Sequence, residues 1–171
     1  MQTPLVMTVI GPDRTGLVEA LARTVANHGD NWLESRMCRL GGEFAGILRV
    51  EVPADKKAGL LGELQKLSGL TVTVHSGETK ISGKSARETK MEIIGQDRPG
   101  IVHEISAALA RAGVNVEEFS SEVVSGAMSG EALFKASLRL QLPETCDVLS
   151  LRMELEKIAA DLLVDVSFAE D

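Results

Sequence analysis

Short apolar runs and amphipathic stretches alternate along the chain in an order that predicts strands and helices. The run from Leu5 to Ile10 is rich in β-branched residues and ends at a Gly-Pro turn, which is typical of a buried strand. Apolar residues then recur at helical spacing from Leu17 to Val25, and Gly29 follows them. This spacing predicts an amphipathic helix that ends at Gly29, because glycine is the usual residue just past a helix C-terminus.

The next part of the chain has the pattern of a hairpin. The pair Gly41-Gly42 separates two stretches, 32–40 and 44–52, and such a pair is a strong signal for a two-residue hairpin loop. In the second stretch apolar residues alternate with polar ones, which predicts a strand with one face in the core. A second helix, with leucines at positions 60 to 67, and a closing strand around Val72 and Val74 complete the series.

The whole series occurs twice. The segment IGPDRTGLVEALARTVANHGDN (10–31) aligns without gaps on IGQDRPGIVHEISAALARAGVN (94–115), at an offset of 84. Further on, FAGILRVEVP (44–53) matches LFKASLRLQLP (133–143) at an offset of 90, so the second copy carries six extra residues. We expect these residues in the stretch SGAMSGE (125–131), as a longer hairpin tip.

The order strand, helix, strand, strand, helix, strand, found twice, predicts the fold class α+β with two tandem ferredoxin-like (βαββαβ) domains. Each is expected to form a four-stranded antiparallel sheet with two helices on one face. The segment 76–89 is rich in Ser, Gly, Thr and charge and has no sustained period, which is typical of a linker. We therefore predict a first domain at 1–80, a linker at 81–88 and a second domain at 89–171, with the boundary near Gly83.

Composition and charge exclude several classes of protein. A content of 44% hydrophobic and 25% charged residues is typical of a globular protein, and the net charge of -7 argues against direct binding of nucleic acid. The absence of Tyr, with one Trp and four Phe, argues against an RNA-binding sheet that stacks bases. No segment has the pattern of a signal peptide or a membrane span, so we expect a cytoplasmic protein.

The cysteines and histidines indicate neither a metal site nor a catalytic site. Cys38 and Cys146 form no CxxC pair, and we expect a buried thiol at Cys38, in a strand, and an exposed one at Cys146. His28, His75 and His103 are scattered, and none lies near a Cys or a carboxylate at ligand spacing. We therefore expect no enzyme activity, no metal and no cofactor.

The repeated loop GxDRxG, between the first strand and the first helix of each copy, is the most specific motif in the chain. Followed by an apolar helix that ends in HGDN or AGVN, it resembles the ACT domain, a family of small-molecule-binding regulatory modules. Two such copies with no further domain, and a first hairpin reading ESRMCRLGGEFAGILRV, resemble the glycine cleavage system transcriptional repressor family. These resemblances imply a ligand near the loop, often at a seam between ACT domains.

The chemistry of the loop residues also suits an amino acid. A helix N-terminus attracts a carboxylate, a glycine there lets the ligand approach, and an aspartate accepts an ammonium group. The alternative is that the aspartates only cap turns and the glycines only form them. The candidate ligand-binding residues are Gly11, Asp13, Arg14, Thr15, Gly16, Asn31, Gly95, Asp97, Arg98, Pro99, Gly100 and Asn115.

The resemblance to the repressor family implies a function in regulation. The partner would be a DNA-binding transcriptional activator, and the signal glycine or a related amino acid. Two alternatives stay open at this point: a regulator of an enzyme of amino-acid metabolism, and a scaffold whose loops bind no ligand. We also expect a homodimer, because sheets of this topology leave edges unpaired.

Overall fold

The computed structural model describes residues 2–75, 86–125 and 130–169, and the chain divides into two compact units, 1–81 and 82–171. The first unit contains β1 (Gln2–Pro12), α1 (Leu17–Asn27), β2 (Asn31–Leu40), β3 (Glu43–Pro53), α2 (Lys57–Leu64) and β4 (Thr71–His75). The second contains β5 (Ala86–Gln96), α3 (Ile101–Arg111), β6 (Asn115–Ser125), β7 (Ala132–Pro143), α4 (Val148–Leu162) and β8 (Val164–Phe168).

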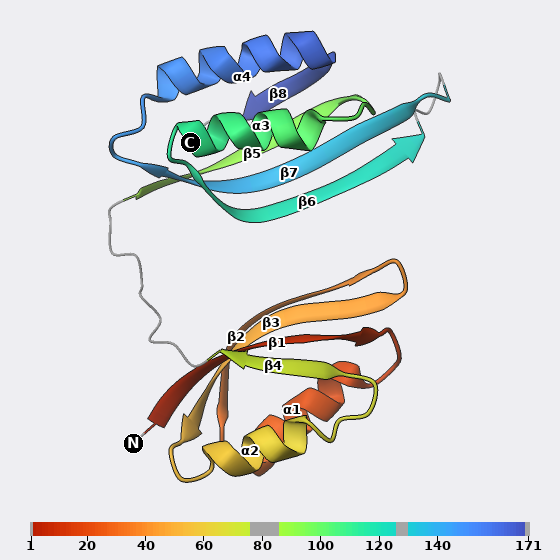
Figure 1. Ribbon diagram of the computed structural model, residues 1–171, viewed down its shortest axis with the longest axis vertical. Coiled ribbons are helices and arrows are strands. Elements are labelled where there is room, and N and C mark those ends of the chain that lie inside the picture. Colours follow the sequence, from red (N-terminus) through yellow and green to blue (C-terminus); the bar gives the residue numbers. More distant parts are fainter. Residues whose placement is uncertain (1, 76–85, 126–129, 170–171) are drawn as a thin grey trace. The chain divides into compact units, whose positions relative to one another are not determined.

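Each unit is an antiparallel sheet with both of its helices on one side (Figure 1). The strand orders are β2-β3-β1-β4 and β6-β7-β5-β8, so the two copies share one topology. The predicted α+β fold class and the ferredoxin-like arrangement of both copies are therefore confirmed.

The ends of the elements follow the local sequence. Gly29 and Gly113, just past the first helix of each copy, have φ of 72° and 71°, a conformation that glycine adopts at no steric cost. Gly41 and Gly42 have φ of 60° and 88°, as the two central residues of a tight β2–β3 hairpin require.

The core of each unit lies between its sheet and its helices. The first core is formed by alternate residues of β1 and β3 and by one stripe of each helix, including Met7, Leu21, Val50 and Leu60. The second core repeats it with Met91, Ile105, Leu140 and Leu155 at its centre. Two separate apolar cores explain why the chain forms two units.

Both connecting segments that the sequence predicts, the linker and the longer hairpin tip, lie partly outside the described residues. Residues 81–85 of the predicted linker lie outside the described residues, whereas residues 86–88 already belong to β5, where Arg87 pairs with Leu142 of β7. The predicted longer hairpin tip at 125–131 lies mostly outside the described residues as well; Ser125 ends β6, and Ala132 begins β7.

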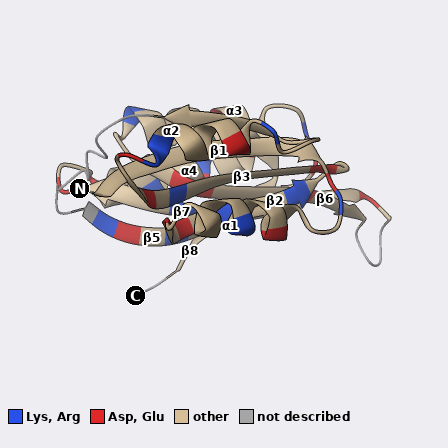
Figure 2. Ribbon diagram, turned by 90° about the horizontal axis from the view of Figure 1, so that it is seen from below, with Lys and Arg blue, Asp and Glu red and all other residues tan. Residues whose placement is uncertain are grey.

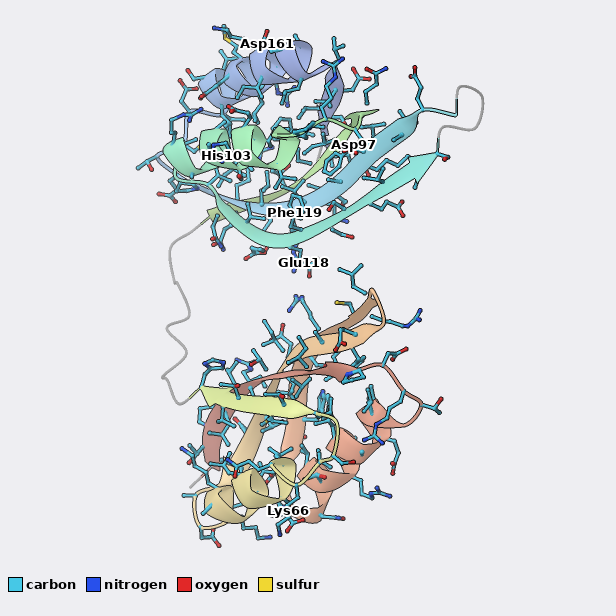
Figure 3. All side chains as sticks on the ribbon, turned by 45° about the vertical axis from the view of Figure 1, so that its right-hand side comes forward. Lys66, Asp97, His103, Glu118, Phe119 and Asp161 are labelled. Atoms are coloured by element: carbon cyan, nitrogen blue, oxygen red, sulfur yellow. The ribbon has the colours of Figure 1, made fainter. Side chains whose placement is uncertain are left out.

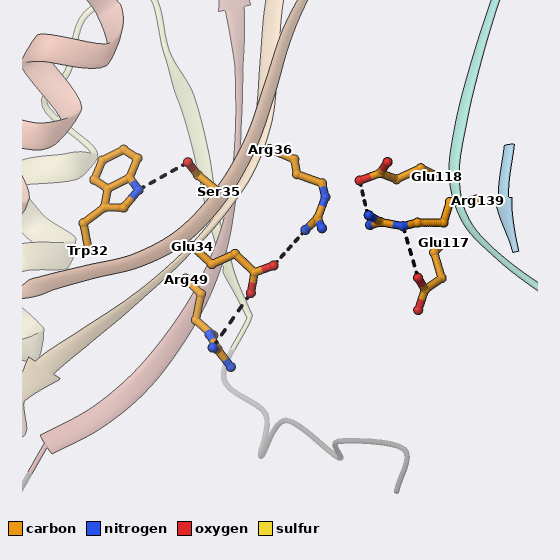
Figure 4. Close-up of polar contacts among 8 residues, drawn as sticks. All are labelled: Trp32, Glu34, Ser35, Arg36, Arg49, Glu117, Glu118 and Arg139. Carbon is orange, nitrogen blue, oxygen red and sulfur yellow. Dashed lines mark hydrogen bonds and ion pairs between the residues drawn. The ribbon is translucent and has the colours of Figure 1, made fainter. Parts of the chain in front are cut away.

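The sheet face away from the helices carries the same cross-strand ion pair in both units (Figure 4). Glu34 of β2 contacts Arg49 of β3 at 3.8 Å, and Glu118 of β6 contacts Arg139 of β7 at 2.8 Å. Each pair follows an irregularity in the register of the edge strand. The pairs therefore belong to the repeated fold and do not distinguish the two copies.

Candidate ligand-binding site

Gly11 and Gly95 lie at the ends of β1 and β5, where the backbone just before β4 and at the start of β8 leaves no room for a side chain. A Cβ at Gly11 would overlap the carbonyl oxygen of Gly69, and a Cβ at Gly95 would lie 2.5 Å from Cα of Val164. Both positions therefore require glycine, because a Cβ at either would collide with the backbone that leads into the closing strand.

Gly16 and Gly100 precede the first turns of α1 and α3. Both have left-handed backbone, with φ of 89° and 98°, and a Cβ at either would meet only open space. No side chain in the described part of the chain caps either helix, whereas Asp147 at the start of α4 accepts hydrogen bonds from the amides of Leu149 and Ser150. The first-turn N–H groups of α1 and α3 therefore remain available for an anion.

The charged groups of the first loop are bound within the first unit. The Asp13 carboxylate forms an ion pair of 2.6 Å, Oδ2 to Nε, with Arg39 of β2, and the Asp13 amide donates to the carbonyl of Gly42 at 2.8 Å. The Arg14 guanidinium donates to the carbonyl of Ser68 in the connection between α2 and β4. Asp13 and Arg14 thus lie where the hairpin, the loop and the closing strand meet.

The second loop has the same backbone arrangement and different side-chain partners. The Asp97 amide donates to the carbonyl of Ala132 at 2.9 Å, but its carboxylate has no hydrogen bond or ion pair with any residue that the structure describes (Figure 3). Arg98 donates to Oε1 of Gln96 at 3.1 Å, and Nε2 of Gln96 donates to Oε2 of Glu131 at 3.0 Å. The Asp97 carboxylate is exposed and available to a cation.

The remaining two loop candidates, Thr15 and Pro99, are exposed at the same position of the two loops. Neither makes a side-chain hydrogen bond within the described ranges. Nothing in the geometry gives either residue a role beyond forming the loop.

Asn31 and Asn115 lie away from the loops. Asn31 pairs with Glu51 of β3, whereas Gly11 pairs with Phe44 of the same strand, so the two positions are roughly 23 Å apart along the sheet at about 3.3 Å per residue. Asn115 pairs with Gln141, which is equally far from Phe134, the partner of Gly95. A small amino acid cannot span this distance, so within one unit the asparagines do not share a site with the loop.

Arg39, Gln96 and Glu131 lie around the loops and are not among the residues that the sequence predicts for the site. A signal for Arg39 was present, because β1 and β3 are neighbours in this topology and the Gly41-Gly42 tip must then lie beside the loop that follows β1. Gln96 and Glu131 could not be found in this way, because their contact depends on side-chain direction.

Neither a metal site nor a membrane span is found in the described part of the chain. No group of three or more His, Cys, Asp or Glu residues within it could hold a metal ion. His28 contacts the carbonyl of Thr24 through Nδ1 at 2.9 Å, and His103 is exposed on α3. None of the described helices is long and apolar enough to span a membrane. Basic and acidic residues alternate along β5, as Figure 2 shows, and they form no basic strip there.

Both expectations about the cysteines are wrong. Cys38 is exposed, because it lies on the face of β2 that points away from the helices, and Cys146 is half-buried against the second core. Burial, and then the charge of Asp147, raise the pKa of the Cys146 thiol. Position in a strand did not indicate burial, since a strand of this sheet has one open face.

We expect Cys38 to react first with iodoacetamide at neutral pH. Thiolate is the reactive form, and the raised pKa of Cys146 lowers its thiolate fraction at neutral pH. Partial burial also limits access of the reagent to this thiol. Mass spectrometry of tryptic peptides after a short exposure measures both rates, and the Cys38→Ser variant should then show only slow labelling. Faster labelling of Cys146 would contradict the burial described here.

Comparison with known proteins agrees with this architecture. Residues 3–75 and residues 90–134 each match the ACT domain family. A curated relative, the UPF0237 protein MK1213 of Methanopyrus kandleri, is 40% identical over 75 residues, which are 43% of this chain and 77% of that protein.

Two solved structures are similar over the full length. An unknown protein from Galdieria sulphuraria has a TM-score of 0.90 at 27% identity, with 100% of this chain and 99% of that chain covered. A structure described as a putative glycine cleavage system transcriptional repressor has a TM-score of 0.66 at 17% identity, with the same coverage of 100% and 99%. At that identity the second likeness shows the fold alone. The chain belongs to the ACT domain family, with one ACT domain in each of its two units.

Proposed function

We propose that this protein is a non-catalytic sensor of a small amino acid, such as glycine, and that it controls transcription indirectly through a protein partner. ACT domains bind small-molecule ligands such as amino acids, which supports the first half of the proposal. The second half draws on the full-length structural neighbour described as a putative glycine cleavage system transcriptional repressor.

One observation carries the proposal: a helix N-terminus without a side-chain cap lies next to an aspartate in each unit. The free N–H groups at the start of α1 or α3 suit a carboxylate, and the adjacent Asp13 or Asp97 suits an ammonium group. An α-amino acid carries both charges a few ångströms apart. The capped N-terminus of α4 serves as an internal contrast, since Asp147 occupies the position that an anion would take there.

The proposed mechanism is a coupled equilibrium. A ligand that binds one conformational state more tightly than another shifts the protein toward that state, and a partner that recognises only that state then responds to the ligand. We further propose a homodimer, because the outer strands β2, β4, β6 and β8 each have one edge without a neighbour among the described strands.

Thermal unfolding against the twenty amino acids at millimolar concentration tests the proposal. A ligand that binds only the folded state stabilises it by about 1.4 kcal/mol at a concentration ten times its Kd, so the midpoint must rise. Acetate and methylamine, each carrying one of the two charges of glycine, are the matched controls and should give little shift. If no amino acid shifts the midpoint, the sensor is excluded and a ligand-free scaffold remains.

Recovery of bound proteins distinguishes the kind of partner. Affinity capture from a lysate, with and without the amino acid that shifts unfolding most, should recover a DNA-binding regulator in a ligand-dependent manner. Recovery of an enzyme of amino-acid metabolism in its place would exclude the transcriptional half of the proposal.

A further inference from the structure

The two loops have the same backbone arrangement and differ in one neighbouring residue of the edge strand. This residue decides whether the loop aspartate has an ion-pair partner. In the first unit Phe44 of β3 pairs with Gly11 on one side and with Arg39 on the other. In the second unit Phe134 of β7 pairs with Gly95 and with Val123. Arg39 and Val123 therefore occupy the same position beside the two loops, and only the first is charged.

The Arg39 guanidinium already binds the Asp13 carboxylate, with Nε 2.6 Å from Oδ2. This is where a ligand's ammonium group would bind if the first loop took an amino acid. Arg39 is part of the same chain, so it is present at a fixed high local concentration and competes with any free ligand. Arg14 is held as well, by the carbonyl of Ser68.

In the second loop no cation of the described chain contacts the aspartate. Val123 is 55% exposed beside it, and the Asp97 carboxylate has no partner in the described ranges. The sequence between Val124 and Lys135, which includes the hairpin tip, contains no Lys, Arg or His at all. Arg98 cannot be held as Arg14 is, because a single residue separates α4 from β8, whereas six residues separate α2 from β4 in the first unit.

We infer that Arg39 acts as a built-in substitute for the ligand's ammonium group, so that the first loop is self-occupied and the second loop alone takes the free amino acid. This inference rests on the proposed function and assigns that function to one copy. The first ACT domain then has a structural or partner-binding role, and each chain carries one sensing site.

The unequal loops predict an unequal response to equivalent substitutions. Isothermal titration calorimetry with glycine, or with the amino acid that shifts unfolding most, should give one site per chain. Asp97→Asn should weaken binding at least about tenfold, because it removes a charged hydrogen-bond acceptor for the ammonium group. Asp13→Asn, the same change in the first loop, should keep one site per chain and weaken binding far less than Asp97→Asn does.

Substitutions at Val123 and Arg39, the two equivalent positions, should reverse which loop binds the amino acid. Val123→Arg places the competing cation beside Asp97 and should remove the single site, as Arg39 does in the first loop. Val123→Gln, similar in length but uncharged, is its control. Arg39→Val should free Asp13 and raise the stoichiometry from one site to two.

The outcomes separate this inference from the proposed function. Two sites per chain in the wild type, or loss of binding in Asp13→Asn with binding retained in Asp97→Asn, would overturn the assignment and leave the sensor intact. Absence of binding of every amino acid to the wild type and to Arg39→Val would overturn both.

Discussion

Gly95→Ala should destabilise the second unit by about 3 kcal/mol, the upper part of the range for overpacking. The added Cβ would lie 2.5 Å from Cα of Val164 and 2.6 Å from the carbonyl oxygen of Leu163. Both are backbone atoms, so no side chain can rotate away, and β8 must move off β5. Urea unfolding followed by circular dichroism measures the loss.

Two further substitutions provide a parallel test in the first unit and a control. Gly11→Ala should have the same effect in the first unit, because its Cβ would meet the carbonyl oxygen of Gly69, and the fluorescence of Trp32 reports on that unit alone. Gly62→Ala, within α2, meets nothing within 4 Å and should stabilise by about 0.5–1 kcal/mol, since alanine favours a helix. A stable Gly95→Ala variant would show that the closing strand is not held against its neighbour.

Asp30→Val is expected to stabilise the first unit by about 1–3 kcal/mol at neutral pH, the cost of leaving a buried polar group without a partner. Both carboxylate oxygens of Asp30 are buried with no hydrogen-bond partner among the described residues. The equivalent position in the second unit is Val114, which is 7% exposed and belongs to the core. The substitution therefore introduces the residue that already occupies this position in the second unit.

The pH dependence of this gain has a defined sign. Burial raises the pKa of Asp30 above its ordinary value of 3.8, with the charges of His28 and Lys56 opposing the shift. The folded state thus binds the proton more tightly than the unfolded state, and stability due to this group rises as pH falls through the raised pKa. The advantage of Asp30→Val should be complete above that pKa and should shrink as the pH approaches 3.8.

Unfolding monitored by Trp32 fluorescence at pH 4 and pH 7 tests both statements. Asp30→Asn removes the charge and keeps the shape, so it should give a smaller gain with little dependence on pH. A loss of stability in Asp30→Val would mean that the carboxylate has a favourable contact in solution, and His28 and Lys56 would then be the partners to mutate next.

The fold could be predicted in advance because its signals are local. The spacing of Leu17, Leu21 and Val25 requires a helix with one buried stripe, and Gly29 and the Gly41-Gly42 pair adopt the positive φ that ends it and turns the hairpin. The repeat adds a second, independent instance of every element. The same local logic placed the GxDRxG loop at a helix N-terminus in both copies.

The prediction of the site was less complete, because side-chain partners depend on contacts between distant residues. Asn31 is a candidate ligand residue by sequence, yet α1 carries the chain back across the sheet, so Asn31 begins β2 at the far end. Cys38 was expected in the core, but its strand has an open face and an edge. Asp30 followed Gly29 in a polar run, and only the packing shows its carboxylate buried.

The sequence by itself determined that the chain is two ACT domains that repeat the GxDRxG loop, because hydrophobic period, turn residues and repetition are properties of neighbouring positions. Only the tertiary structure decided which aspartate has an internal partner. Whether an aspartate is free depends on what lies across two strands from it, Arg39 in one copy and Val123 in the other. That pairing is fixed by strand register, and register is set by the burial of a whole sheet face.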